Sequence, residues 1–485
     1  MSTLVEPREA RGPLGPRLDV GRFPPGFVWG AATAAYQIEG GVAEGGRGPS
    51  IWDTFSHTPG RTFHGDTGDT ACDHYRRWPE DLDLAAGLGL GGYRLSVSWA
   101  RLQPRGHGDL NPEGVAFYRA VLEGLHDRGV RPLVTLYHWD LPQPLEDEGG
   151  WPARSTALAF ADYARRTVAA LGDLASDWIT LNEPWCSSFL GYGTGAHAPG
   201  RTHLPDAVAA AHHLNLAHGL AVRAMREVSD DLRIGITHIL TDLVPASEDP
   251  LDVAARDRVD TNNNQLFLDP LHRGGYSPQV TDLYPALATG ELVRPGDLAI
   301  AATPNDFLGV NHYHRVIVSH DDADPHLGAA QRAAEPATTS FGWSVRPESL
   351  RNVLVRAAQL TGLPLHVTES GASFHDYVDP SGQVQDTERI DYLHGYLTAV
   401  ADAIEDGADV RGYFAWSLLD NFEWGEGYSK RFGLVHVDYA SQTRIPKASA
   451  AWYREQIAAH ARAAVQGRPG PGTAGTTHHH KEMAR

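Results

Sequence analysis

Eight short apolar or β-branched runs recur along the chain, and seven of them are followed by a segment with apolar residues three or four positions apart. The first pattern is typical of strands and the second of amphipathic helices. The strand-like runs span residues 27–32, 93–99, 132–138, 177–183, 234–240, 307–313, 364–369 and 412–417. The helix-like segments span residues 79–88, 112–128, 155–171, 206–228, 347–360, 386–404 and 446–464. This alternation predicts an α/β fold, a single closed (β/α)8 TIM barrel of parallel strands.

The number of domains follows from this pattern and not from length, because 485 residues fit either about three domains or one barrel with insertions. We expect one barrel domain over residues 21–466. Residues 1–20 and 467–485 lack periodicity, which predicts disordered tails, and the histidine run 478–480 is assigned no function. A polar insertion at residues 319–340 follows the sixth strand, on the face where barrel enzymes hold their active sites.

Charge and composition exclude several classes of function. The formal net charge of −19 disfavours nucleic acids and anionic membranes as partners. The only cysteines are Cys72 and Cys186, and no metal-binding motif occurs, so neither a metal nor a cofactor is expected. No long apolar segment predicts a signal peptide or a membrane span. We therefore expect a cytoplasmic protein that acts on a small neutral molecule, and a homo-oligomer is left open.

Residues 87–92 read Gly-Leu-Gly-Leu-Gly-Gly and match the Gly-x-Gly-x-x-Gly pattern of dinucleotide-binding proteins. That pattern requires a strand before it and a helix after it. Here the order is reversed, because a predicted helix precedes the glycines and a predicted strand follows them. The glycines therefore predict an ordinary connection from helix to strand.

Two of the strand-like runs end on a glutamate. Pro184 follows Glu183 and biases it toward extended geometry, so Glu183 is expected as the last residue of its strand, with its side chain beyond the sheet edge. Glu369 ends the seventh run, with Gly371 free to turn the chain. Two such carboxyls suit glycoside hydrolysis, in which one protonates the leaving oxygen and the other attacks the anomeric carbon or activates water. A single strand-end glutamate is more often only a solvated side chain, so the interpretation depends on its neighbours.

Polar and aromatic groups gather at the carboxyl ends of the same runs. They are Gln37, Arg94, His138, Trp139, Asn182, Asn311, Tyr313, Trp416, Glu423 and Trp424. Each alone has a structural explanation, such as a core salt bridge for Arg94 or simple packing for Trp416. Together, at one barrel mouth, they provide the hydrogen-bonding side chains and aromatic surface that a sugar requires.

The chain resembles glycoside hydrolase family 1, the β-glucosidase family, from Phe23 to Trp452. The matching stretches are residues 27–40, 94–99, 136–143, 180–185, 367–371, and 416–424 with 432–435. This resemblance implies that Glu183 is the general acid/base and Glu369 the nucleophile. The residues that it implies for sugar contacts are Asn182, Gln37, His138, Trp424 and Glu423, with Trp416 as the floor of the pocket. It also implies that Arg94 and Tyr313 support the Glu369 carboxylate, where a positive neighbour favours the ionised form that a nucleophile requires. Asn311 and Trp139 are expected to support the site.

Two positions depart from the motifs of the family: Ser370 stands where asparagine is usual, and His312 where tyrosine is usual. Neither substitution removes a reacting group, so the two positions bear on the shape of the pocket and not on the activity. The implied function is that of a retaining β-glucosidase that hydrolyses terminal non-reducing β-D-glucosyl residues of cellobiose or aryl β-glucosides, with some activity on β-galactosides and β-fucosides, as in cellulose degradation. A transglycosidase and a catalytically inactive sugar-binding barrel are the alternatives, and the presence of both glutamates argues against the latter.

Overall fold

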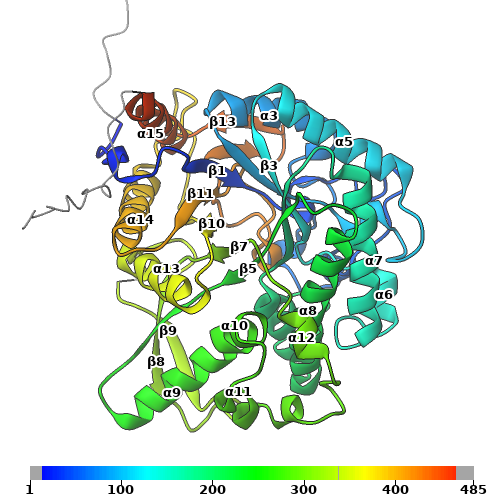
Figure 1. The fold of residues 1–485 in the computed structure, drawn as a ribbon. Helices are drawn as coiled ribbons and strands as arrows, with labels where there is room; N and C mark the ends of the chain where they lie inside the picture. Colours follow the sequence, from blue (N-terminus) through cyan, green and yellow to red (C-terminus); the bar gives the residue numbers. More distant parts are fainter. Residues whose placement is uncertain (1–13, 337, 466–485) are drawn as a thin grey trace, which may run out of the picture.

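The computed structural model describes residues 14–336 and 338–465. Eight parallel strands close into a barrel, in which neighbours in the chain are also neighbours in the sheet (Figure 1). These strands are β1 (Val28–Ala32), β2 (Gly92–Ser96), β3 (Arg131–Tyr137), β4 (Asp177–Asn182), β5 (Arg233–Ile239), β7 (Phe307–Asn311), β10 (Leu365–Ser370) and β11 (Val410–Trp416). The predicted (β/α)8 barrel is confirmed.

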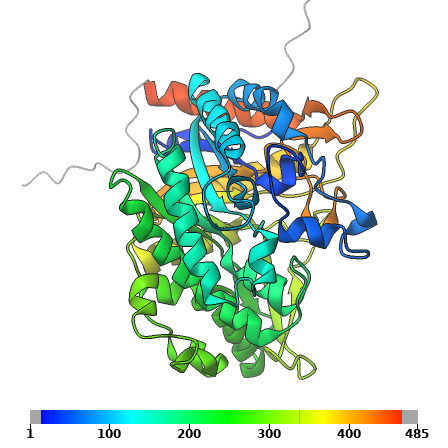
Figure 2. The same ribbon diagram turned by 90° about the vertical axis from the view of Figure 1, so that its right-hand side faces the viewer.

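The helices predicted from apolar spacing surround the barrel, as Figures 1 and 2 show from two directions. They are α3 (His74–Gly87), α5 (Pro112–Asp127), α7 (Arg154–Leu171), α8 (Leu204–Arg226), α13 (Pro347–Thr361), α14 (Thr387–Glu405) and α15 (Ala448–Val465). The start of α3 was predicted wrongly: it begins at His74, so Pro79 lies inside the helix and not at its first position. Residues 87–92 contain the end of α3, the connection 88–91 and the start of β2, as expected for a simple helix-to-strand connection.

The segment between β5 and β7 contains helices that the sequence analysis did not identify. They are α9 (Pro250–Asp260), the π-helical turn η4 (Thr261–Gln265), α10 (Leu266–His272), α11 (Pro278–Leu283) and α12 (Asp297–Ala301). A signal was present, because Asp249 caps α9 and Pro250 occupies its first turn. The shorter elements elsewhere are α1 (Ala35–Ile38), α2 (Ile51–Ser56), α4 (Trp99–Leu102), α6 (Gln143–Asp147), β12 (Val435–Asp438) and β13 (Thr443–Pro446).

The polar insertion after the sixth barrel strand is not a plain loop. It contains β9 (Ala329–Ala333), which pairs with β8 (Arg315–His320), and β8 also pairs with β6 (Asp242–Pro245). This small sheet packs on α9 through its own apolar cluster, which includes Val259 and Val318. Only one side of such short strands is buried, so too few apolar positions alternate for the sequence to predict them.

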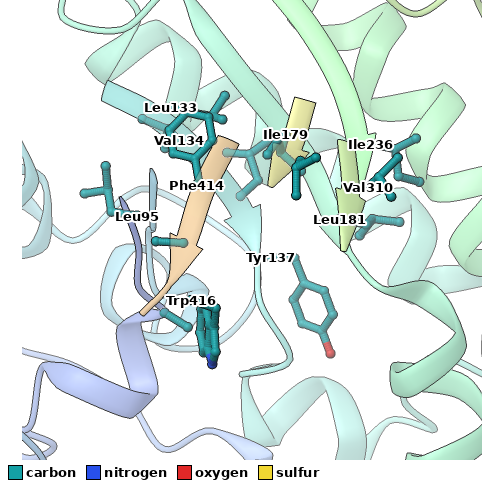
Figure 3. Close-up of a cluster of buried hydrophobic side chains, with 14 of the residues drawn as sticks. Leu95, Leu133, Val134, Tyr137, Ile179, Leu181, Ile236, Val310, Phe414 and Trp416 are labelled. Carbon is teal, nitrogen blue, oxygen red and sulfur yellow. The ribbon is translucent and has the colours of Figure 1, made fainter. Parts of the chain in front are cut away.

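Large apolar side chains from several barrel strands are buried, and Figure 3 shows a cluster of them. Leu95, Val134, Ile179, Ile236 and Phe414 are all buried. Burying one such side chain contributes about 1.5–3 kcal/mol. This packing holds the strands rigidly, so the groups at their carboxyl ends are also held in fixed positions.

Residues 14–20 were assigned to a disordered tail, but they lie against the last helix. The indole of Trp452 donates to the Pro16 carbonyl at 2.8 Å, and Leu18 is buried beside Gln456, whose side chain accepts from its backbone N–H at 3.3 Å. The folded part therefore begins before residue 21. The other residues assigned to the tails, 1–13 and 467–485, lie outside the described residues. Within the described ranges, no helix is long and apolar enough to cross a membrane.

Candidate active site

A cavity of about 610 Å³ opens at the carboxyl ends of the barrel strands. Of the residues predicted for the site, its walls contain His138, Trp139, Glu183, Tyr313, Glu369, Trp416, Glu423 and Trp424. Gln37, Arg94, Asn182 and Asn311 are buried next to these side chains and bonded to them. The structure therefore brings all the predicted residues together.

A smaller cavity of about 210 Å³ lies at the opposite end of the barrel, among the first residues of the strands. Its acidic groups are paired with arginines, as in the contact of 2.5 Å between Arg233 and Asp177. Charged groups at this face of a barrel serve stability and not catalysis.

Glu183 does not have the extended geometry that Pro184 predicted. Strand β4 ends one residue earlier, and Glu183 has a φ of 47°, in the left-handed region. Two backbone hydrogen bonds impose this turn: Glu183 N donates to the Thr237 carbonyl at 2.9 Å, and Cys186 N donates to the Glu183 carbonyl at 3.0 Å. The second bond starts the π-helix η3 (Cys186–Gly193) directly after the strand. The side chain of Glu183 is thereby directed into the cavity, at the cost of backbone strain of order 1–3 kcal/mol.

The Glu183 carboxyl is buried and accepts two hydrogen bonds. Asn311 Nδ2 donates to its Oε1 at 2.5 Å, and Cys186 Sγ donates to its Oε2 at 3.2 Å. Burial, followed by the negative charge of Glu369, raises the pKa of Glu183 above its usual value. A carboxyl in this environment keeps its proton near neutral pH and can serve as a general acid.

Glu369 lies in a different environment. Arg94 donates to its Oε1, and the Tyr313 hydroxyl donates to its Oε2 at 2.6 Å. Arg94 is itself buried, and the ion pair with Glu369 lies inside the barrel mouth. Both oxygens of Glu369 are therefore fixed by donors, one of them charged, and these are the two residues that the family resemblance implies as its support.

Asn182 connects the two glutamates. Its Oδ1 accepts from Arg94 at 2.6 Å and from Asn311 Nδ2 at 3.1 Å, while the same two residues donate to Glu369 and Glu183 respectively. The relative position of the two carboxyls is thus set by one buried network, which reorganises little during a reaction.

Two of the residues predicted for the site each have a buried polar atom without a protein partner. His138 Nε2 accepts from Asn182 Nδ2 at 3.1 Å, so the ring proton sits on Nδ1, which is unpartnered. Burial and the charge of Arg94 lower the pKa of His138, which stays neutral. Gln37 Nε2 donates to Asn421 Oδ1 at 3.0 Å, which leaves its Oε1 unpartnered. Because buried polar atoms are normally bonded, a free donor and a free acceptor here suit the hydroxyl groups of a ligand.

Glu423 is the third carboxyl of the cavity. Burial, followed by the charges of Glu369 and Glu183, raises the pKa of Glu423 to about 8. Gln37 Nε2 approaches its Oε2 at 3.4 Å and opposes this rise. With a pKa of about 8, Glu423 is mostly protonated at neutral pH, and it can both donate to and accept from hydroxyl groups.

Indole and imidazole rings form a continuous wall beside these carboxyls. His138 stacks between Trp416 and Trp424, with centroid distances of 5.9 and 6.0 Å, and Trp139 lies 4.7 Å from Trp424. Trp139 and Trp424 also have left-handed φ values, 79° and 52°, like Glu183. Strained backbone at three neighbouring positions indicates that their side-chain directions are selected for a function.

The two departures from the motifs of the family do not line the cavity. Ser370 is buried and its hydroxyl lies 3.1 Å from the Tyr392 hydroxyl of α14. His312 contacts the Leu240 carbonyl at 2.8 Å and Ser349 Oγ of α13 at 2.6 Å. Both side chains point from the barrel toward the surrounding helices, so the doubt about pocket shape is removed.

Ser370→Asn is expected to keep kcat/KM within about tenfold, or about 1.4 kcal/mol in the barrier, because this side chain points away from the reacting groups. It should lower the melting temperature, since the larger amide must fit between buried residues at a cost of about 1–3 kcal/mol. Thermal unfolding and kinetics on a nitrophenyl glycoside measure both effects. Complete loss of activity in a folded variant would contradict this.

The sequence analysis missed the outer wall of the cavity. Trp343 stacks on Phe341 at 4.2 Å and on His314 at 4.8 Å, and lies 5.3 Å from Tyr313. Phe432, though part of a matched motif, was given no role, yet it lines the same wall. Trp343 does not follow a strand end, and only tertiary packing brings it to the mouth. Among the residues that the structure describes, no group of three or more His, Cys, Asp or Glu side chains is arranged to bind a metal ion.

The fold and the site together define a glycoside hydrolase of the barrel type: two buried carboxyls, one protonated and one held by a guanidinium, face one cavity among hydroxyl-binding groups. Comparison with known proteins gives the family. The sequence model for Glycosyl hydrolase family 1 matches residues 20–462, and the chain belongs to this family.

Relatives with assigned functions support this membership. The chain is 46% identical over 459 residues to a bifunctional β-D-glucosidase/β-D-fucosidase of Bifidobacterium breve, with 90% of this chain and 98% of that protein covered. Among solved structures, a family 1 β-glucosidase from Thermotoga maritima superposes with a TM-score of 0.88 at 42% identity, covering 90% and 98% of the two chains. A psychrophilic β-glucosidase from Micrococcus antarcticus has a TM-score of 0.88 at 44% identity, covering 92% and 99%.

Proposed function

We propose that this protein is a retaining β-glucosidase that hydrolyses terminal non-reducing β-D-glucosyl residues by double displacement. The observation that carries the proposal is the contrast between the two carboxyls: Glu369 accepts from Arg94 and Tyr313, whereas burial and the charge of Glu369 keep Glu183 protonated. Environments that separate two neighbouring carboxyls in this way assign the acid and the nucleophile.

In the first step, Glu369 attacks the anomeric carbon while Glu183 transfers its proton to the departing glycosidic oxygen. The covalent glycosyl-enzyme forms as the aglycone leaves as an alcohol. In the second step, Glu183, now ionised, removes a proton from water, which attacks the anomeric carbon and releases Glu369. Loss of the negative charge of Glu369 in the intermediate lowers the pKa of Glu183, because that charge is one of the causes that raise it.

The other predicted residues are proposed to bind the sugar. His138 Nδ1–H and Gln37 Oε1 offer a free donor and a free acceptor, and Glu423 lies next to Gln37. Trp416 and Trp424 present ring surface to the C–H face of a pyranose. Asn182 is held between Arg94 and His138, where we propose that it contacts the 2-hydroxyl. The B. breve relative, which acts on glucosides and fucosides, supports comparable activity here on sugars that differ at carbons 4 and 6.

We expect the enzyme to hydrolyse nitrophenyl β-glucoside and to reject its 6-phosphate. The cavity holds the Glu369 carboxylate beside Glu183 and Glu423, whose pKa values are raised, and a phosphate with between one and two negative charges would have to be buried next to them. The two cations that follow Glu423 in the chain are bonded elsewhere: Lys430 donates to the Ser340 carbonyl at 2.9 Å, and Arg431 contacts Asp420 at 2.7 Å. Arg332 also lines the cavity, but it is exposed to solvent.

The test is a panel of nitrophenyl β-glycosides at equal concentration, with the glucoside, galactoside, fucoside and glucoside 6-phosphate, and with the product anomer followed by NMR. The β-anomer of glucose as first product supports retention. A higher kcat/KM for the 6-phosphate would overturn this interpretation of the pocket. Absence of turnover on all substrates would favour the inactive sugar-binding alternative, and transfer to an added alcohol in preference to water would favour a transglycosidase.

The cytoplasmic location and the oligomeric state stay predictions.

A further inference from the structure

Cys186 occupies the position next to the proposed proton donor in space as well as in the chain. Its Sγ lies 3.2 Å from Oε2 of Glu183, and both side chains are buried. The backbone bond from Cys186 N to the Glu183 carbonyl, 3.0 Å long, opens η3 at this point. The same turn that fixes the φ of Glu183 therefore folds the thiol back onto the carboxyl three residues earlier.

The hydrogen bonds identify which oxygen of Glu183 carries the proton. Asn311 Oδ1 accepts from Thr368 Oγ1 at 2.7 Å, which fixes the orientation of the Asn311 amide. Its Nδ2 donates to Glu183 Oε1 at 2.5 Å, and an amide N–H can only donate. Oε1 is thus held as an acceptor, and the transferable proton resides on Oε2, the oxygen that Cys186 contacts.

We propose that Cys186 is a positioning residue for the acid/base, whose S–H occupies one lone pair of Glu183 Oε2 and leaves the O–H of that oxygen directed into the cavity. The inference rests on the proposed function, in which Glu183 is the proton donor. This inference assigns a role to the Cys186 side chain, which without this contact would be interpreted only as a small buried thiol. Cys186 and Asn311 together hold both oxygens of the carboxyl, so its plane is fixed before substrate binds.

The thiol also acts on the charge of Glu183. Burial, followed by the Glu183 charge, raises the pKa of Cys186 well above its usual value, so the sulfur keeps its proton and remains a donor. A donor favours the ionised carboxyl, so Cys186 and Asn311 lower the pKa of Glu183 against the opposing effects of burial and Glu369.

The charged and titratable groups around Glu183 come from five other parts of the barrel. They are Arg94 on β2, the neutral His138 after β3, Tyr313 after β7, Glu369 on β10 and Glu423 after β11. None of these groups changes when Cys186 is replaced. A change in the pH profile of a Cys186 variant therefore reports the thiol contact.

The test compares Cys186→Val, which has no donor, with Cys186→Ser, which keeps one. General acid catalysis requires protonated Glu183, so kcat/KM falls as pH rises through the pKa of Glu183 in the free enzyme. Loss of the donor raises this pKa, and the alkaline limb in Cys186→Val should move up by about 0.5 pH unit. In Cys186→Ser the limb should stay at the wild-type position or move below it.

A purely structural role predicts a different result, in which both variants lose activity and thermal stability while the limb stays in place. That outcome, or equal shifts in Val and Ser, would overturn the inference. The control is Glu183→Gln, assayed on an activated aryl glucoside, in which the alkaline limb should disappear and adding Cys186→Val should not change the profile. If the limb persists in Glu183→Gln, the proposed function fails. If it disappears there but is unmoved by Cys186→Val, only the role of Cys186 fails.

Discussion

Glu369→Ala is expected to reduce kcat by about 10⁴-fold or more, the scale seen when a catalytic nucleophile is removed. Without this carboxylate no covalent intermediate can form, and water cannot approach the anomeric carbon with comparable orientation. The variant also leaves Arg94 without its partner in a buried site. Circular dichroism must therefore show that the barrel is still folded before the loss is attributed to chemistry.

Two measurements make this result specific for Glu369. A 2-deoxy-2-fluoro glucoside with a good leaving group should inactivate the wild-type enzyme, and peptide mapping should find the label on Glu369. Added azide should restore turnover in Glu369→Ala and yield the α-glucosyl azide, because the anion enters from the face that the carboxylate occupied. A label on Glu183 or Glu423, or a β-azide from this variant, would show that the nucleophile is assigned wrongly.

The barrel was predictable because its signal is repeated. Apolar strand runs followed by amphipathic segments such as residues 112–128 match α5 and its counterparts closely. The candidate site followed from the same pattern, since the carboxyl ends of parallel strands meet at one mouth. Glu183, Glu369 and the groups around them were found by their position at these ends, without knowledge of their contacts.

Other features depend on contacts that no local pattern contains. The rule for a residue before proline failed at Glu183, because hydrogen bonds to Thr237 and Cys186 outweigh that preference. Trp343 reaches the mouth from a segment that is not a strand end, held by packing on Phe341. The outward direction of Ser370 was within reach, because side chains alternate along a strand and Glu369 points inward.

Glu183→Gln is expected to lower kcat/KM for alkyl β-glucosides by about 10²- to 10⁴-fold, the usual contribution of a general acid. The loss on nitrophenyl β-glucoside should be far smaller, since a good leaving group departs with little protonation. The substitution preserves the geometry of the site. The glutamine carbonyl can still accept from Asn311, and its amide nitrogen takes the place of Oε2, where the Cys186 sulfur must then accept instead of donate.

The comparison must use kcat/KM, which reports the first irreversible step, formation of the glycosyl-enzyme. The second step also slows in this variant, for every substrate equally, because Glu183 is then the base that activates water. A plot of kcat/KM against the pKa of the leaving alcohol should therefore be steeper in Glu183→Gln than in the wild type. Parallel plots, with equal losses for alkyl and nitrophenyl substrates, would mean that Glu183 does not protonate the leaving oxygen. The raised pKa of Glu183 would then be a consequence of burial beside Glu369 without a catalytic use.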